Sequence, residues 1–233
     1  TRFATQFSSI LDEHSEQPLQ LVGLMLDGVM QVVEPRETRI VHQDMFRDAM
    51  CFLHIVTFWN TWDRCDDTDE MWRHATVKLV RTLTALIAGN DDSKAFFSDT
   101  IGYDQLQELL VRAGDVSDEL LVAVLSMMFD GEAEADGHSK IQNADCVTMY
   151  VKLLFTREPS FAAAKVARLL TVLTRFSTNT QSCCDIGLLD LLIARLPGLR
   201  DADLQRQTLK LIEIVGGHSI TAKQLRDFLR LMV

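Results

Sequence analysis

The sequence contains little proline and little glycine, four and eleven among 233 residues, which argues against a disordered or loop-built protein. With 47% hydrophobic residues, a chain of this length can bury a sizeable core. It has no run of about 18 uncharged apolar residues, so no membrane insertion is expected. The opening TRFATQFSSILDEHSEQ lacks the form of a secretory signal and does not begin with Met. We therefore expect a piece of a longer polypeptide.

Cysteines are few, odd in number and irregularly spaced: Cys51, Cys65, Cys146, Cys183 and Cys184. A chain of this size with that pattern is not a disulfide framework, so we expect a reducing, cytoplasmic environment. The net charge of −10 argues against nucleic acid as a partner. The charge is uneven, because residues 195–233 hold seven basic and four acidic side chains, a net of +3 against −13 for the rest.

Apolar residues recur at three- and four-residue spacing along most of the chain, and no convincing run alternates with period two. Gly89 and Gly216 follow two such stripes, as expected at the ends of helices. Pro159 suits a first helical turn, and Thr221 with Gln224 forms a capping box. The sequence therefore predicts an all-α protein.

The helical pattern also repeats. Three joints, IGYDQLQELL, NADCVTMYVKLL and IGLLDLLIARL, each follow a long apolar helix and lead into a leucine-rich one. If Gly102, Asp145 and Gly187 are equivalent, the spacings are 43 and 42 residues. A period near 42 in helical sequence is typical of armadillo and HEAT arrays. We predict a right-handed superhelical solenoid of armadillo/HEAT type with roughly three to four units.

The stretch AGNDDSKAFFSDTIGYDQLQELL, residues 88–110, raises the alternative of a phosphate-binding loop. That motif needs G-x-x-x-x-G-K-[ST] after a strand, whereas no strand is expected here and Tyr103 follows Gly102. We interpret the stretch as a joint with Gly102 at its bend. Residues 1–60 depart from the pattern and are expected to form a degenerate first unit or cap, with the repeats in residues 61–233. Within the first part, IVHQDMFRDAMCFLHIVTFW is expected to form one long helix.

Few residue groups suggest chemistry. Zinc ligation by Cys51, His54, Cys65 and His74 lacks tight pair spacing. The acidic run that begins at Asp130 has Ala135 and Ile141 where a calcium loop needs glycine and glutamate. A redox pair of Cys183 and Cys184 is disfavoured by the neighbouring Asp185. We therefore expect no metal, no cofactor and no catalysis. Trp59, Trp62 and Trp72 are expected to pack between the first units rather than to form an exposed anchor.

The polar sides of the long helices carry basic residues at helical spacing. Third helices line the concave groove of an armadillo array, so a locally basic groove is expected for an acidic or phosphorylated protein segment. The alternative is a solvated surface without a partner. The candidate binding residues are Lys78, Arg81, Lys165, Arg168, Arg175, Arg206 and Lys210.

Two segments, LTALIAGNDDSKAFFSDTIGYDQLQELL and the closing LIEIVGGHSITAKQLRDFLRLM, resemble the helical array of the giant BEACH-domain proteins, the neurobeachin, lysosomal-trafficking-regulator and Alfy group. The resemblance covers residues 77–233, and GHSI with the leucines that follow is similar to the end of that array. It implies a cytosolic scaffold in vesicle, lysosomal or autophagic membrane traffic, attached to membranes only through other parts of the parent protein.

Four functional hypotheses remain after these arguments. The first is a non-catalytic protein-binding module of a larger scaffold. The second is a formin-like regulatory armadillo domain that binds a Rho-type GTPase and an autoinhibitory helix. The third is an enzyme with an active site between helices, which requires a cleft with perturbed pKa values. The fourth is a structural spacer. We expect the first.

Overall fold

The computed structural model describes residues 18–61, 69–113, 116–131 and 140–231, and the regular elements within these ranges are all helices. None of these helices is both long and apolar enough to cross a membrane. The helices group into two compact units that divide between Gly131 and Glu132. The all-α solenoid fold is confirmed, while the predicted division into residues 1–60 and 61–233 stays a prediction.

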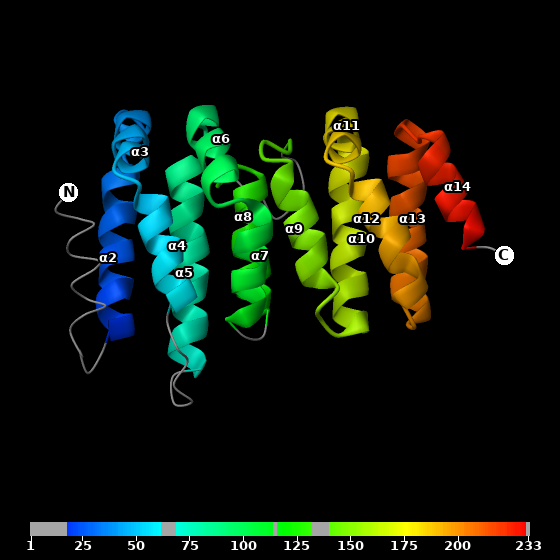
Figure 1. The fold of residues 1–233 in the computed structure, drawn as a ribbon, viewed down its shortest axis with the longest axis horizontal. Helices are drawn as coiled ribbons and strands as arrows, with labels where there is room; N and C mark the ends of the chain where they lie inside the picture. Colours follow the sequence, from blue (N-terminus) through cyan, green and yellow to red (C-terminus); the bar gives the residue numbers. More distant parts are fainter. Residues whose placement is uncertain (1–17, 62–68, 114–115, 132–139, 232–233) are drawn as a thin grey trace. The chain divides into compact units, whose positions relative to one another are not determined.

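The first unit contains seven described helices, and α5 lies between α2 and α8 and packs against both (Figure 1). The shorter helices α3 and α4 precede α5, as α6 and α7 precede α8, so the order of a three-helix repeat occurs twice. The helices are α2 (Pro18–Val33), α3 (Arg39–Asp48), α4 (Cys51–Thr61), α5 (Asp69–Ile87), α6 (Asp91–Thr100), α7 (Tyr103–Arg112) and α8 (Asp118–Met128).

The second unit shows the same order, and its two long helices, α10 and α13, pack side by side (Figure 1). The short helices α11 and α12 separate them in the chain, and α14 follows α13. The elements are α9 (Asp145–Leu154), α10 (Pro159–Arg175), α11 (Ser177–Asp185), α12 (Leu188–Arg195), the 3₁₀ turn η2 (Leu196–Gly198), α13 (Ala202–His218) and α14 (Ala222–Arg230).

The bends between first and second helices lie where the repeat spacing predicted them. Gly102 (φ 79°) immediately precedes α7, and Gly187 (φ 73°) immediately precedes α12. In this left-handed region a Cβ is unfavourable, which explains the glycines. The third predicted position, Asp145, is one residue too late, because Ala144 is the N-cap and Asp145 is already the first residue of α9.

The long helix predicted from IVHQDMFRDAMCFLHIVTFW is wrong, because the chain breaks between α3 and α4. Met50 adopts φ 57°, a positive value like those of Gly102 and Gly187. A glycine would have revealed this bend in the sequence, but a methionine gives no such signal. The sequence therefore contained no sign that α3, α4 and α5 form a three-helix set of their own.

Helix ends agree with the sequence at some positions and differ at another. Pro159 is the first residue of α10, and Thr221 and Gln224 form both bonds of the predicted capping box. The stop expected at Gly216 is wrong, since α13 continues to His218. Gly216 and Gly217 do not adopt a positive φ, so both remain helical and the helix ends only before Ser219.

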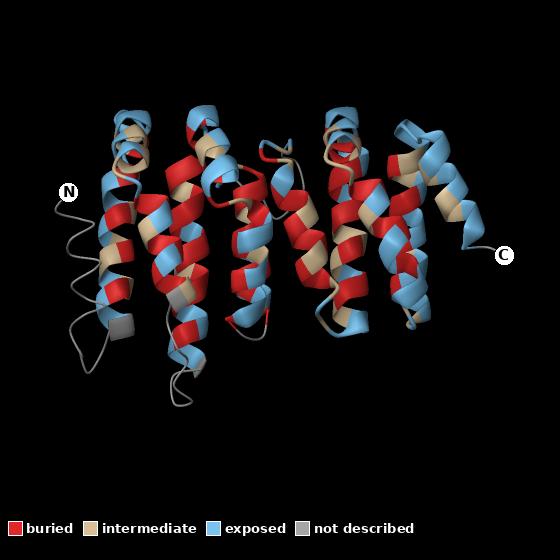
Figure 2. Ribbon diagram, in the orientation of Figure 1, coloured by how far each residue is buried: buried red, intermediate tan, exposed pale blue. Residues whose placement is uncertain are grey.

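The core of each unit is formed by the apolar stripes of its long and its short helices. On α5 the side chains of Leu79, Val80, Leu83, Leu86 and Ile87 are fully shielded from solvent. Buried residues recur along the facing sides of α2, α5 and α8, and again along α10 and α13 (Figure 2). Burial on two opposite sides is what a helix between two neighbours requires.

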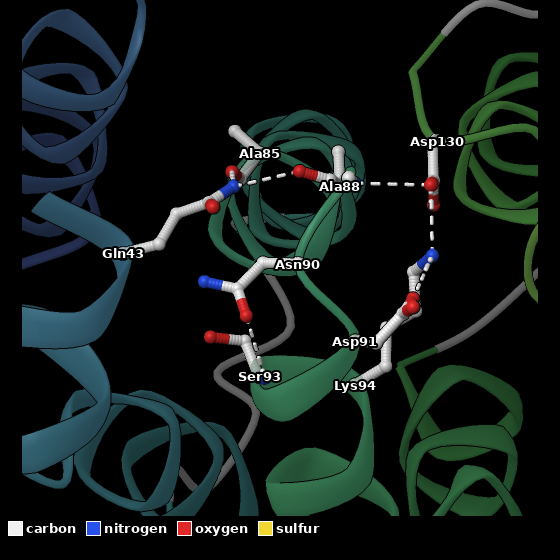
Figure 3. A network of polar contacts seen from close by, with 9 residues as sticks. Gln43, Ala85, Ala88, Asn90, Asp91, Ser93, Lys94 and Asp130 are labelled. Carbon is white, nitrogen blue, oxygen red and sulfur yellow. Dashed lines mark hydrogen bonds and ion pairs between the residues drawn. The ribbon is translucent and has the colours of Figure 1, made fainter. Parts of the chain in front are cut away.

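A polar network fixes the joint that follows α5 (Figure 3). The buried amide of Gln43 on α3 donates to the carbonyls of Ala85 and Ala88, at 2.8 and 2.9 Å. These are among the carbonyls that the end of a helix leaves without a partner. Asn90 caps α6 by accepting from the backbone N–H of Ser93 at 3.0 Å. Through Gln43, α3 is thus bonded to the C-terminal end of α5, the third helix of the same three-helix set.

The same joint is tied to the end of α8. The Asp130 carboxylate accepts from the backbone N–H of Gly89 at 3.0 Å and from the Lys94 ammonium at 2.8 Å (Figure 3). Both charged side chains are about 15% exposed, so the ion pair is only weakly screened by solvent. The interpretation of residues 88–110 as an inter-helix joint is therefore confirmed, and Asn90 and Lys94 in it have structural partners.

Candidate partner-binding surface

The seven basic candidates all lie on long helices, but they divide between the two units. The first unit contributes two residues on α5, and the second contributes three on α10 and two on α13. In chain order they are Lys78 and Arg81, then Lys165, Arg168 and Arg175, then Arg206 and Lys210.

In the first unit, one of the two candidates has a structural partner. The Lys78 ammonium lies 2.9 Å from the Asp27 carboxylate and 3.5 Å from the carbonyl oxygen of Gly23, both on α2. Its charge therefore bridges α2 and α5 instead of adding to a basic surface. Arg81 is exposed three residues further along α5. The first unit thus offers a weaker positive field than the sequence suggested.

In the second unit, α10 concentrates positive charge. It carries three basic residues and no acidic one along its 17 residues. Arg168 is half-buried and Arg175 is exposed, and their spacing of seven places them on one side of the helix with exposed Thr171. Lys165 is half-buried, with its ammonium 5.1 Å from the centre of the Phe161 ring, a favourable cation–π distance.

The neighbouring helix α13 adds two more cations. Lys210 is exposed, whereas the Arg206 guanidinium donates to the Asp203 carboxylate one turn earlier in the same helix. Both partners of that pair are largely solvent-exposed, so it contributes little to stability. α10 and α13 pack together, so two neighbouring helices carry the basic side chains of Arg168, Arg175, Arg206 and Lys210. We call these four residues the α10–α13 basic surface.

The cysteines of the described residues are unsuited to nucleophilic chemistry. Cys51, Cys146 and Cys183 are buried free thiols, and burial raises the pKa of Cys51 to about 11. Burial, and secondly the neighbouring Cys184, raise the pKa of Cys183 to about 12. Burial and then Asp185 raise the pKa of Cys184, whose thiol donates to the Val215 carbonyl at 3.4 Å. The thiols of Cys51, Cys183 and Cys184 therefore stay protonated near neutral pH, as buried structural cysteines do.

The metal-site alternatives gain no support from the described ranges, in which no group of three His, Cys, Asp or Glu side chains could hold an ion. Cys65 and most of the acidic run after Asp130 lie outside the described residues, and Asp130 itself bonds Lys94. The expectation that the tryptophans are packed rather than exposed is confirmed for two of them, although their contact joins α4 and α5 within one three-helix set. Trp59 and Trp72 are buried and stack with ring centres 5.5 Å apart, while Trp62 lies outside the described residues.

Two cavities in the first unit were not expected from the sequence. One, of about 500 Å³, is mainly apolar and is formed by α2, α3 and the start of α4, with Val32, His42, Met45, Phe46, Asp48, Ala49 and Cys51 as its lining. The other, of about 550 Å³, is open to solvent and is lined by Asn60, Gln105, Gln107, Glu108, Val111 and Arg112. The first cavity is formed by three consecutive helices and the second joins Asn60 of α4 to α7, so no single motif marked either of them.

Comparison with known proteins identifies relatives of this chain. The family model described as neurobeachin, neurobeachin alpha solenoid region, matches residues 1–233. BEACH domain-containing protein B of Arabidopsis thaliana is 30% identical over 195 residues, which cover 82% of this chain and 7% of that protein. The chain thus spans a small part of the curated relative that it matches. No solved structure matches.

Proposed function

Because this chain belongs to the neurobeachin alpha solenoid region family, we propose that it is a non-catalytic protein-binding module of a large BEACH-domain scaffold. A solenoid exposes an extended surface to partners, and each repeat needs only its neighbours for stability. The relative is named for its BEACH domain, and this chain matches 7% of the length of that protein. The formin-like alternative stays a prediction that none of these comparisons tests.

The observation that carries the binding role is the charge of α10, which has three cations and no anion in a protein of net charge −10. Together with Lys210 and Arg206 on α13, it supports binding of an acidic or phosphorylated protein segment. Such a segment gains charge-assisted contacts at the α10–α13 basic surface, whereas the rest of an acidic protein repels it. The proposed setting is cytoplasmic, in vesicle, lysosomal or autophagic membrane traffic.

We test this proposal by affinity capture from cytosolic lysate, with bound proteins identified by mass spectrometry. The variant Arg168→Glu/Arg175→Glu reverses two charges on one side of α10. It should reduce capture of the partner at least about tenfold, since each reversal replaces attraction by repulsion. Capture should also weaken as salt is raised from about 50 to 300 mM, because exposed charges are screened.

The matched control is Arg36→Glu/Arg195→Glu, which makes the same change in net charge at two exposed residues that do not belong to α10 or α13. It should retain the partner, and all three proteins should melt within a few degrees of one another. Equal capture by both variants would rule out this surface, and absence of any specific partner would favour a structural spacer.

A further inference from the structure

The helix α14 has an exposed apolar side. It begins with a complete capping box, so its start is defined within the chain. None of its residues is buried, although Leu225 and Leu229 lie one turn apart on one side. These two leucines are 45% and 53% exposed. A short helix at the surface rarely leaves adjacent leucines this exposed without a partner.

The repeat shows what covers this side elsewhere. α14 follows α13 as α6 follows α5 and α11 follows α10. The seventh residue of each helix is Phe97 in α6, Cys183 in α11 and Phe228 in α14. Phe97 and Cys183 are fully buried, whereas Phe228 is only partly buried. This position therefore belongs to the core in α6 and α11, whereas in α14 its side chain is only partly covered.

The contacts of Phe97 identify the missing neighbour. Its ring lies 5.9 Å from that of Phe52 on the preceding second helix, α4, and 5.1 Å from that of Tyr103. Tyr103 is the first residue of the following second helix, α7. α11 likewise packs on α12 and α13, which follow it. α14 packs on the preceding second helix, α12, where Gln224 donates to Asp190 at 2.7 Å.

The charges around α14 limit what can cover it. Lys223, Arg226 and Arg230 oppose a single acid, Asp227, which pairs with Arg230 at 3.5 Å. A second copy of α14 would bring like charges together, which disfavours a symmetric dimer through this helix. An apolar helix with acidic residues at its edge matches both the leucines and the basic rim.

We propose that α14 is the first helix of a further three-helix unit, and that the following helices of that unit, supplied by the same long polypeptide, cover Leu225, Phe228 and Leu229. The relative is about fourteen times longer than the matched part, since that part is 7% of it, so a parent protein of that kind has ample chain for another unit. The sequence resemblance had suggested that this segment closes the array. The incomplete packing of α14 favours continuation.

The test compares residues 1–233 with the same chain lengthened by one natural repeat, about 42 residues. Phe228→Ala should lower the thermal midpoint by at least about 4 °C in the longer chain, where the ring is enclosed, and by less than about 1 °C in the shorter one. Amide hydrogens of α14 should exchange at least about tenfold more slowly in the longer chain. Leu209→Ala on α13, exposed like Leu225, is the control and should change neither protein by more than about 1 °C.

Three results would overturn the inference. The first is an equal effect of Phe228→Ala in both chains, which would mean that the added residues do not reach α14. The second is binding of the longer chain to phosphatidylserine vesicles that is lost with Leu225→Glu/Leu229→Glu, which would assign the helix to a membrane surface. The third is dimerisation of the longer chain, seen by light scattering and lost with the same variant.

Discussion

At the scale of single residues, burial separates two leucines that occupy similar stripes in the sequence. Leu83 on α5 is 0% exposed, and Leu170 on α10 is 9% exposed. α5 has helices on both sides, so an alanine at residue 83 leaves a cavity that its neighbours cannot easily fill. Leu170 keeps some access to solvent, so its replacement by alanine removes less buried surface and should reduce stability less.

Leu83→Ala should therefore reduce the free energy of unfolding by about 3–5 kcal/mol, and Leu170→Ala by about 2–3 kcal/mol. Urea denaturation followed by circular dichroism measures both. The exposed Leu24→Ala on α2 is the control, with an expected change of less than about 1 kcal/mol. If Leu83→Ala shifts the midpoint no more than Leu24→Ala, the assignment of the α5 core is wrong.

At the scale of helices, the bends decide where one element ends and the next begins. The bend before α4 uses Met50, and the bend before α7 uses Gly102, with φ 57° and 79°. A positive φ costs a residue with a Cβ about 1–2 kcal/mol. The backbone is therefore strained at Met50 but not at Gly102. Met50 is 46% exposed and contributes little to the core.

Met50→Gly should be more stable than Met50→Ala by about 1 kcal/mol, because both lose the side chain and only alanine keeps the strain. Gly102→Ala should destabilise by about 1–2 kcal/mol for the same reason. Gly28 in the middle of α2 has open space around its Cβ position, so Gly28→Ala should stabilise by about 1 kcal/mol. Guanidinium denaturation checks the signs, and a stabilising Gly102→Ala would contradict this account of the bend.

At the scale of the whole molecule, the contacts group the helices into a unit up to Gly131 and a unit from Glu132. Each contains its own packed helices and apolar core, with α5 against α2 and α8 in one unit and α10 against α13 in the other. Repeat proteins gain stability from neighbouring helices rather than from distant contacts. Each unit therefore has the contacts needed to fold by itself.

We expect residues 1–131 and residues 132–233, produced separately, each to show a helical circular dichroism spectrum and a cooperative urea transition. Leu83→Ala should lower the midpoint of the first fragment, and Leu192→Ala, also 0% exposed, that of the second. A fragment that binds a hydrophobic dye and unfolds without cooperativity would show that its core needs the other unit.

The sequence by itself determined the helical class, the repeat and most helix positions, because apolar spacing and glycine or capping residues act locally. It placed the bend at Gly102 and the capping box of Thr221, and it identified the family. It also selected the basic residues of α10, since a helix with three cations and no anion is visible from composition alone.

Only the tertiary structure decided the rest. The bend at Met50 has no local signature, since packing imposes it on a residue that does not favour it. The ion pair of Lys78 with Asp27 and the bonds of Gln43 to the end of α5 join residues about 40 to 50 positions apart. Whether a charge faces a partner or a neighbouring helix depends on such distant contacts, and spacing along one helix contains no information about them.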